Sequence, residues 1–300
     1  FVPSRYLTMP GGFTQEMRAE LEAAGFRPSR SLGQNFMRDG NLIAALVRDS
    51  GASAGELILE PGPGAGALTA ELLAAGCEVL AVELDRRLAA FLRRRFAGEP
   101  RFRLMEGDIL EKGRQLSAEA VAALGRRPFR VCSNLPYSAA TPFLVALAGS
   151  GLPWRSAAVT VQKEVAERLA AEPRSEDYGA ATVLLAVRAG CRLLREVPPD
   201  VFWPRPKVSS AILQLEPLAT PLVAPGEMEG FAALVRGLFS ARRKQLPRAL
   251  EVAGLAPETA RAALAAAGAE PTARPEALSP DQFVRIWRSS RDADGTGARA

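Results

Sequence analysis

The chain has 300 residues, 48% of them hydrophobic, with a net charge of +5 and no histidine. Its length suffices for one large domain or two ordinary ones, and no apolar run approaches the roughly 20 residues that a membrane helix needs. The lack of histidine excludes histidine bases and ligands, and three widely spaced cysteines argue against zinc and against a disulfide framework. We therefore expect a protein of the reducing cytoplasm with no metal site and no membrane contact.

The beginning of the chain is expected to form an extension over residues 1–30. It contains one candidate amphipathic helix, TQEMRAELEAAGF. The stretch SLGQNFMRDGNLIAALVRDSG follows, and it is expected to form an irregular turn that leads into a second helix.

From Gly55 onward, short apolar runs alternate with helical stretches. Strands are expected in ELILEP, CEVLAVELD, RFRLMEGDI, FRVCSN and AAVTVQ. Strands that alternate with helices predict an α/β fold with a parallel, doubly wound sheet covered on both faces. VSSAILQL is expected to be a late strand, after a proline-rich stretch that breaks the alternation.

Past Pro217 the sequence changes to helical stretches rich in Ala, Leu and Arg, such as FAALVRGLFSARRKQLPRAL and APETARAALAAAG. We therefore expect a catalytic domain at residues 31–217 and a small all-helical domain at residues 218–290. The final stretch, residues 291–300, is expected to be a disordered tail.

A glycine-rich loop, GPGAG, separates the first expected strand from a helix. Ligands of the nucleotide kind bind at this edge of a parallel sheet, and glycine lets the backbone come close to them. We expect the backbone of Gly62 and Gly64 to bind such a ligand. A plain strand-to-helix turn is one alternative, and a dinucleotide site is another, because Gly62-x-Gly64-x-x-Ala67 loosely fits that fingerprint.

Carboxylates follow the next two expected strands. Glu83 could accept hydrogen bonds from ribose hydroxyls, which suits NAD and S-adenosylmethionine equally, and Asp108 could accept an adenine amine. Each could instead cap a helix. Their positions at successive strand ends, after a glycine loop, favour a ligand site, and Glu60 is a third acid beside it.

The stretch CSNLPYS ends the fourth expected strand. Pro136 biases Leu135 to an extended conformation, so that the Leu135 carbonyl can lie beside the side-chain oxygen of Asn134. Pro136 has no N–H with which to compete, and Tyr137 offers a flat face for stacking on a base. Two acceptors at one point suit a planar amine with two N–H donors, such as N6 of adenine. The alternative is a proline turn with a buried tyrosine.

Such a site could transfer a methyl group without a strong base. The two acceptors would hold the amine and direct its lone pair toward a sulfonium methyl group, so that positioning lowers much of the barrier. This chemistry is consistent with a chain that has no histidine.

These motifs, in this order, resemble the ribosomal RNA adenine N6-dimethyltransferases that modify the small subunit. The match covers residues 32–287 and includes LGQNF, LEPGPGAGALT, VELD, GDI, NLPY, QKEVAERL, VFWPRPKVSSAILQL and FSARRKQLPRAL. The resemblance implies a Rossmann-like methyltransferase sheet that uses S-adenosyl-L-methionine, with a small C-terminal all-helical domain.

The resemblance also implies roles for individual residues. The cofactor would contact Asn35, Met37, Gly62, Glu83, Asp108 and Asn134. Catalysis would use Asn134, Leu135 and Pro136, and Tyr137 and Phe202 would sandwich the target adenine. The substrate would be two adjacent adenines in a hairpin loop near the 3′ end of 16S ribosomal RNA, each receiving two methyl groups. The protein would act as a monomer on assembling small subunits.

The sequence departs from the family pattern in places. Pro61 stands where an aliphatic residue is usual, Met37 replaces leucine, and Ser138 replaces a common asparagine. Trp203 and Arg205 in FWPRPKV stand where smaller residues or prolines are usual. The changes beside Tyr137 and Phe202 bear on the second methyl transfer, and none removes an expected catalytic group.

Two groups of cations are candidates for RNA contact. The run ARRKQ places Arg242, Arg243 and Lys244 in the helical domain, and Lys163 begins a helix at a strand end, where it could meet phosphate. For the run, the alternative is a solvated helix face.

Four rival functions share parts of this pattern. A 23S ribosomal RNA methyltransferase of the macrolide-resistance type usually has isoleucine in place of Leu135. A glutamine or DNA methyltransferase would more often show NPPY. A non-catalytic RNA-binding assembly or transcription factor would not need the intact acceptor pair, and a nicotinamide dehydrogenase would leave Asp108 and NLPY without a role.

Overall fold

The structure is a computed structural model that describes residues 13–23, 25–29 and 32–297. The chain divides into two compact units. The first runs to Ala166 and includes Arg192–Glu216, and the second consists of Glu167–Cys191 together with the chain from Pro217 onward. The sequence placed a boundary at Pro217, but it assigned residues 167–191 to the catalytic domain, whereas the structure groups them with the second unit.

A seven-stranded sheet organises the fold, with the strand order β4-β3-β2-β7-β8-β11-β9. The strands are β2 (Leu57–Pro61), β3 (Glu78–Glu83), β4 (Phe102–Glu106), β7 (Phe129–Asn134), β8 (Trp154–Gln162), β9 (Ala189–Val197) and β11 (Ser210–Pro217). The strands from β4 to β8 run parallel, and β11 pairs antiparallel with β8. The predicted α/β fold with a doubly wound sheet is confirmed.

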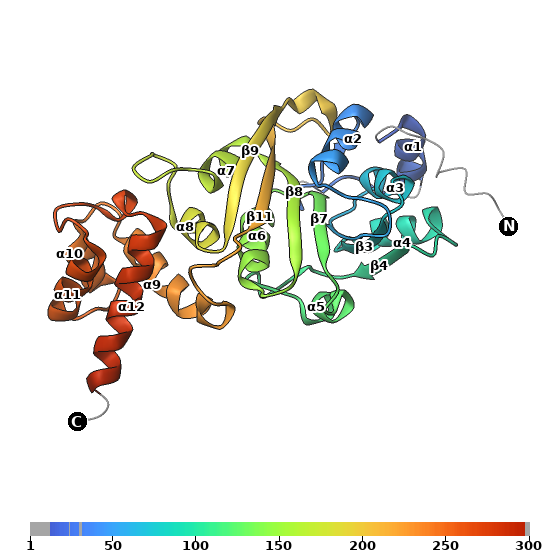
Figure 1. Cartoon of the computed structure of the whole chain (residues 1–300). Coiled ribbons are helices and arrows are strands. Elements are labelled where there is room, and N and C mark those ends of the chain that lie inside the picture. Colours follow the sequence, from blue (N-terminus) through green and yellow to red (C-terminus); the bar gives the residue numbers. More distant parts are fainter. Residues whose placement is uncertain (1–12, 24, 30–31, 298–300) are drawn as a thin grey trace. The chain divides into compact units, whose positions relative to one another are not determined.

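Helices cover both sides of this sheet (Figure 1). They are α2 (Gly40–Asp49), α3 (Ala67–Ala74), α4 (Arg86–Arg95), α5 (Ala118–Leu124), α6 (Ala140–Gly149) and α7 (Lys163–Leu169), with α1 (Gln15–Ala23) before them and η1 (Pro199–Val201) late in the unit. Burial of apolar residues from both layers drives this packing: Ile58 and Val79 of the sheet share a fully buried cluster with Leu46 of α2 and Leu72 of α3. Side-chain caps fix where two helices begin, because Asp39 accepts from backbone N–H groups of α2 and Asp85 from one of α4.

Two very short strand pairs lie outside the main sheet. β1 (Phe36–Met37) pairs antiparallel with β10 (Phe202–Trp203), and β5 (Leu110–Glu111) pairs with β6 (Gln115–Leu116). The first pair joins the LGQNF motif to the FWPRPKV motif, although more than 160 residues separate them in the chain.

The second unit is helical. It contains α8 (Ala180–Ala186), α9 (Met228–Ser240), α10 (Leu246–Val252), α11 (Pro257–Ala267) and α12 (Pro280–Gly297), with short turns η2 (Pro225–Glu227) and η3 (Pro275–Ala277). Aromatic contacts hold it together: Phe239 stacks on Phe283, with ring centroids 5.7 Å apart, and Phe231 meets Trp287 edge to face. α12 continues past Arg291 to Gly297, where the sequence predicted a disordered tail; residues 298–300 lie outside the described part.

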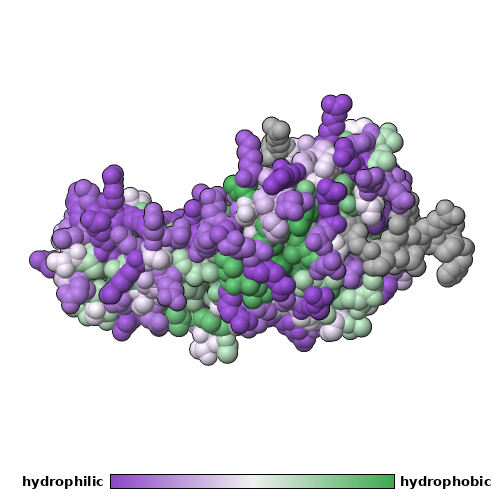
Figure 2. Space-filling view, turned by 90° about the horizontal axis from the view of Figure 1, so that it is seen from above, coloured by the Kyte–Doolittle hydropathy of each residue, from purple (hydrophilic) through white to green (hydrophobic). Residues whose placement is uncertain are grey.

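Figure 2 shows a face on which hydrophilic residues predominate around a hydrophobic area near its centre. Among the described helices, none combines the length and the apolar character that spanning a bilayer requires.

Candidate active site

The site lies where the order of the parallel strands reverses. Numbered in chain order, the seven strands run 3-2-1-4-5-7-6 across the sheet, so chain connections leave β2 and β7 in opposite directions. A crevice forms at such a switch point. A pocket of about 310 Å³ lies there, lined by the loops after β2, β3, β4 and β7 and by residues 32–37.

Two positions next to the NLPY motif require glycine, one in the loop after β2 and one in the LGQNF motif. Gly62 has φ +67°, and a Cβ on it would lie 3.2 Å from Cδ of Pro136. Gly33 has φ +63°, and its Cβ would lie 3.2 Å from the backbone nitrogen of Tyr137. Because both positions combine a left-handed backbone with a close neighbour, any side chain there would displace NLPY.

Glu83 lies at the end of β3, 5% exposed, facing the loop after β2. Its two carboxylate oxygens accept hydrogen bonds from backbone N–H groups, at 3.1 Å from Gly64 and at 2.9 Å from Asp85. Burial raises the pKa of this carboxyl group to about 7, against the lowering effect of those hydrogen bonds. Glu83 therefore fixes the glycine loop and presents a carboxylate to the pocket.

Glu60 is the second buried acid of the pocket. It is 1% exposed on β2, and its Oε2 accepts a 2.6 Å hydrogen bond from the hydroxyl of Thr69 on α3. Burial first, and the nearby charge of Glu83 as well, raise its pKa to about 8. The sequence noted this residue without giving it a role.

Asp108 lies just after β4, exposed at the pocket wall. Its Oδ1 accepts a 2.9 Å hydrogen bond from the backbone N–H of Leu110, so the carboxylate is held by its own loop rather than by a helix. The helix-cap alternative therefore does not apply to Asp108. Glu83 ends β3 beside Asp85, and it is Asp85 that caps α4.

Asn134 ends β7 at the pocket and is oriented by the N-terminal part of the unit. Its Nδ2 donates a 2.8 Å hydrogen bond to the carbonyl of Asn35. Because the NH2 group of Asn134 donates to Asn35, the side-chain oxygen Oδ1 points away from Asn35. No described residue donates a hydrogen bond to this Oδ1. Asn35 itself lines the pocket, and its amide donates to the carbonyl of Gly33 at 3.2 Å.

The rest of NLPY is held rigidly. The backbone N–H of Leu135 donates to Thr160 of β8 at 3.1 Å, which extends the sheet by one residue. The hydroxyl of Tyr137 lies 3.1 Å from that of Ser210 at the start of β11, and burial raises the pKa of the Tyr137 hydroxyl. The backbone carbonyl of Leu135 and the ring of Tyr137 therefore belong to one fixed turn beside the pocket.

Phe202 is placed differently from the expectation. It is 2% exposed and lies in the same apolar cluster as Met37, its β1–β10 partner in register, and Leu46. It does not line the pocket. The sequence motif could not show this, because the side-chain direction depends on the two-residue β1–β10 pair. In this arrangement Tyr137, and not Phe202, offers an aromatic face next to the acceptors.

The cations expected to meet RNA are in part engaged. Lys163, at the start of α7, forms an ion pair with Glu196 of β9. In the second unit, Arg242 donates to the carbonyl of Glu176 at 2.7 Å, whereas Arg243 and Lys244 are exposed. The run lies in the turn between α9 and α10, so it is not a helix face.

Several supporting residues escaped the sequence analysis. Ser133 donates to the carbonyl of Pro61 at 2.6 Å and so joins the ends of β7 and β2. The side chain of Gln34 accepts from the backbone of Ser29 at 2.7 Å and donates to Asp85 at 3.0 Å. Both lie inside motifs already noted, CSNLPYS and LGQNF, but Pro61 and Asp85 are distant from them in sequence.

These groups suit an elongated cofactor with an adenine, a ribose and a charged amino-acid end. Glycine backbone can approach it closely, the Glu83 carboxylate can accept from ribose hydroxyls, and Asp108 lies at the next strand end for the adenine amine. The fold and this pocket define a Rossmann-like methyltransferase that uses S-adenosyl-L-methionine.

The family model for ribosomal RNA adenine dimethylases matches residues 25–291. The chain therefore belongs to the ribosomal RNA adenine dimethylase family, and it is an enzyme of that type. The dehydrogenase alternative is excluded by this membership.

Relatives named ribosomal RNA small subunit methyltransferase A are similar along almost the whole chain. The protein of Geobacter metallireducens is 40% identical over 272 residues, covering 90% of this chain and 98% of the relative. That of Gloeobacter violaceus is 39% identical over 271 residues, covering 88% and 94%.

Among solved structures, the 23S rRNA methyltransferase ErmE is 26% identical, with a TM-score of 0.61, covering 85% of this chain and 99% of that one. A dimethyladenosine transferase from Plasmodium falciparum, 19% identical with a TM-score of 0.66, covers 83% and 95% and shows the same fold.

Proposed function

We propose that this protein adds two methyl groups to N6 of each of two adjacent adenines in a hairpin loop near the 3′ end of 16S ribosomal RNA. It acts on assembling small ribosomal subunits in the cytoplasm, as a monomer. The observation that carries the chemistry is the Asn134 amide: its NH2 group donates to the carbonyl of Asn35, which leaves its oxygen available in a pocket that Leu135 also lines. Small-subunit relatives at 37–40% identity support the choice of RNA.

The two oxygens act by holding the target amine. Each accepts one N–H of the N6 amine, and this favours a pyramidal nitrogen whose lone pair faces the cofactor side of the pocket. The ring of Tyr137 stacks on the base and fixes its plane, and Ser210 holds the phenol in place.

When bound, the cofactor supplies a methyl group on a positively charged sulfur. Glu83 and the glycine loop would hold its ribose end and Asp108 its adenine, and Asn35 and Met37 line the same pocket. The N6 nitrogen that accepts this methyl group would become cationic. The two acceptor oxygens would stabilise that charge until a proton leaves to solvent, so no side chain has to act as a strong base.

Methylation of 23S ribosomal RNA is the second candidate, because the solved 23S rRNA methyltransferase ErmE has the same fold at 26% identity. The two candidates differ in the RNA and share the chemistry of the pocket.

A substrate comparison separates the two. Purified small subunits that lack the modification and protein-free 23S RNA are each incubated with methyl-labelled cofactor, and the labelled nucleosides are mapped by mass spectrometry. We expect dimethyladenosine at two adjacent positions near the 3′ end of 16S RNA, and little label in 23S RNA. Label confined to 23S RNA would refute the proposed substrate, and label on a base other than adenine would refute the proposed chemistry.

A further inference from the structure

Residues 33–37 serve both the cofactor and the catalytic amide, yet their own strand is minimal. Asn35 and Met37 line the pocket, and the carbonyl of Asn35 orients Asn134. The strand within this segment, β1 (Phe36–Met37), is paired through two residues only, with Phe36 opposite Trp203 in β10. So short a ladder has little stability by itself, and other contacts must fix this segment.

Those contacts come from the segment just before α1. The backbone N–H of Phe13 donates to the carbonyl of Met37 at 2.7 Å, at the β1 residue that pairs with Phe202. The ring of Phe13 stacks on Phe36 and on Trp203, with centroid distances of 5.0 and 5.2 Å and interplanar angles of 20° and 10°. We call Phe13, Phe36 and Trp203 the aromatic stack.

The N-terminal helix extends this stack on its outer side. The guanidinium of Arg18 lies 4.6 Å from the ring centroid of Trp203, and it is held there by a 2.8 Å ion pair with Glu22 one turn later in α1. Phe13 is only 5% exposed, and it shares a buried cluster with Met17 of α1.

On its inner side the aromatic stack contacts the glycine loop after β2. A Cβ on Gly64 would lie 3.0 Å from the ring of Phe36, so this ring packs directly on the loop backbone. The same Gly64 donates its N–H to the carboxylate of Glu83. Phe13 also lines the pocket itself. Contacts therefore run from α1 through the stack to residues 33–37 and to the glycine loop, both of which line the pocket.

We propose that Phe13 and Trp203 are positioning residues for cofactor binding, and that the N-terminal segment with α1 is part of the methyltransferase site. They hold residues 33–37 and the glycine loop in the geometry that accepts the cofactor, and through Asn35 they hold the amide of Asn134. Trp203 is the ring that joins α1 to the site.

A selective effect on the cofactor follows. Removing either ring frees residues 33–37 without touching the exposed cations that would bind RNA. Each aromatic pair contributes a factor of a few to the equilibrium constant between the ordered and the free state of residues 33–37. We therefore expect Phe13→Ala and Trp203→Ala to weaken cofactor binding roughly tenfold, to raise KM for the cofactor by a similar factor, and to leave KM for RNA within about twofold of wild type.

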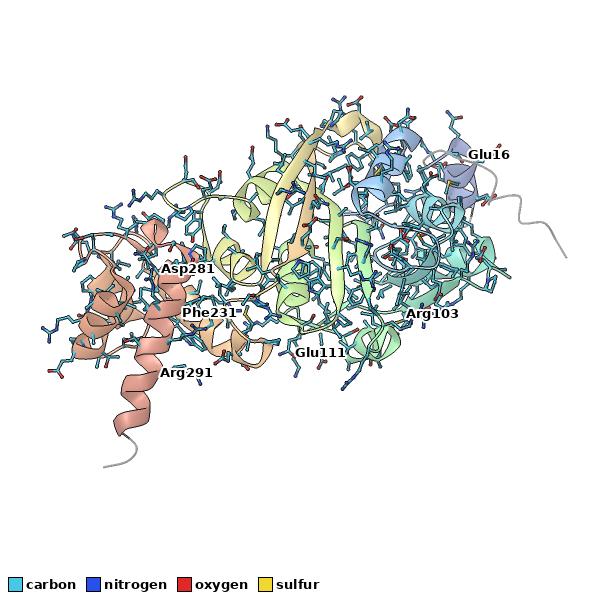
Figure 3. All side chains as sticks on the ribbon, in the orientation of Figure 1. Glu16, Arg103, Glu111, Phe231, Asp281 and Arg291 are labelled. Atoms are coloured by element: carbon cyan, nitrogen blue, oxygen red, sulfur yellow. The ribbon has the colours of Figure 1, made fainter. Side chains whose placement is uncertain are left out.

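The test uses calorimetric titration of the full-length protein with S-adenosylmethionine and with S-adenosylhomocysteine. The matched control is Phe231→Ala, which removes a fully buried ring that has an aromatic neighbour in the second unit (Figure 3). Circular dichroism at the titration temperature establishes that each variant is folded. Trp203→Phe, which retains a ring that can stack, should recover most of the affinity. Arg18→Ala, at a half-exposed side chain where folding is not at risk, should weaken binding two- to threefold.

Cofactor affinities of Phe13→Ala and Trp203→Ala within twofold of wild type would overturn the proposal. An equal loss in Phe231→Ala would also overturn it, because the effect would then be one of general destabilisation. If the alanine variants do not fold, the proposal is tested with Trp203→Phe and Arg18→Ala instead. Wild-type cofactor affinity in Arg18→Ala, together with weakened cofactor affinity in Trp203→Phe, would contradict the proposal.

Discussion

Two buried carboxyl groups, Glu60 and Glu83, line one pocket from neighbouring strands, and burial raises the pKa of both. Their partners differ. Glu60 accepts from the hydroxyl of Thr69, whereas both oxygens of Glu83 accept from backbone N–H groups at the pocket edge. These partners divide the roles: Glu60 supports the β2–α3 junction, and Glu83 offers its charge to a ligand.

Glu60 makes stability depend on pH. Its folded-state pKa of about 8 lies above the ordinary value of 4.5, so its contribution to the free energy of unfolding is fully present below pH 4.5 and is lost as the pH rises through 8. Between these two pH values, this group lowers the free energy of unfolding by at most about 1.4 kcal/mol per pH unit. Glu60→Gln retains an acceptor for Thr69 and removes the titration. Urea unfolding at pH 6 and pH 8.5 should show that the free energy of unfolding falls less between these pH values in the variant than in wild type. Equal decreases in the two proteins would contradict the assignment.

Glu83 makes cofactor affinity depend on pH with the opposite sign. Its pKa is about 7 in the free protein, and the ionised carboxylate is the form that accepts from two ribose hydroxyls, so affinity should rise with pH until about 7 and then level off. Glu83→Gln should weaken binding by 1.5–3 kcal/mol, roughly 10- to 150-fold at pH 8, and should remove the pH dependence. Calorimetric titrations between pH 6 and 8.5 measure both effects. A variant that binds as tightly as wild type would exclude Glu83 as the ribose acceptor.

At the scale of elements, the turn between α9 and α10 separates structural from available charge. Arg242 is tied to the carbonyl of Glu176, and it lies 3.9 Å from the carboxylate of Glu276. Arg243 and Lys244 project from the turn as exposed side chains. The ARRK run therefore offers two cations, rather than three, to a phosphate backbone.

Neutralising Arg243 and Lys244 together, as Arg243→Gln with Lys244→Gln, should reduce the salt slope of RNA binding by about 1.4–1.8. Arg242→Gln is the comparison. Its main effect should be on the thermal stability of the second unit, because it removes the bond to residue 176. Filter binding of a 16S fragment between 50 and 300 mM salt gives the slopes. An unchanged slope in the double variant would make the turn a solvated surface.

The sequence predicts those elements whose signal is local. Runs such as ELILEP and FRVCSN are strands because they are buried on both faces, and their polar ends mark the pocket edge. No strand was predicted for AGCRLLREV, which forms β9 at the sheet edge, because it has no continuous apolar run and includes two arginines and a glutamate. The burial of Phe202 and the role of Phe13 depend on pairing between β1 and β10, segments far apart in the chain, and no local pattern encodes it.

At the scale of the whole molecule, the chain combines a methyltransferase sheet with a helical unit that has its own aromatic core. The catalytic logic suits a protein without histidine, because positioning by fixed oxygens replaces proton transfer by a side chain. Asn134 is central to this mechanism, because residues 33–37, the end of β7 and the target amine are expected to meet there.

Single-turnover methylation by Asn134→Ala, at saturating cofactor and small subunits, tests this claim most directly. The variant loses one of the two acceptors that direct the amine, so the rate of the chemical step should fall on the order of 10²-fold or more. RNA binding should change little, and cofactor affinity should change modestly. A rate within a few-fold of wild type would show that NLPY is only a turn at the end of β7, and would contradict the mechanism.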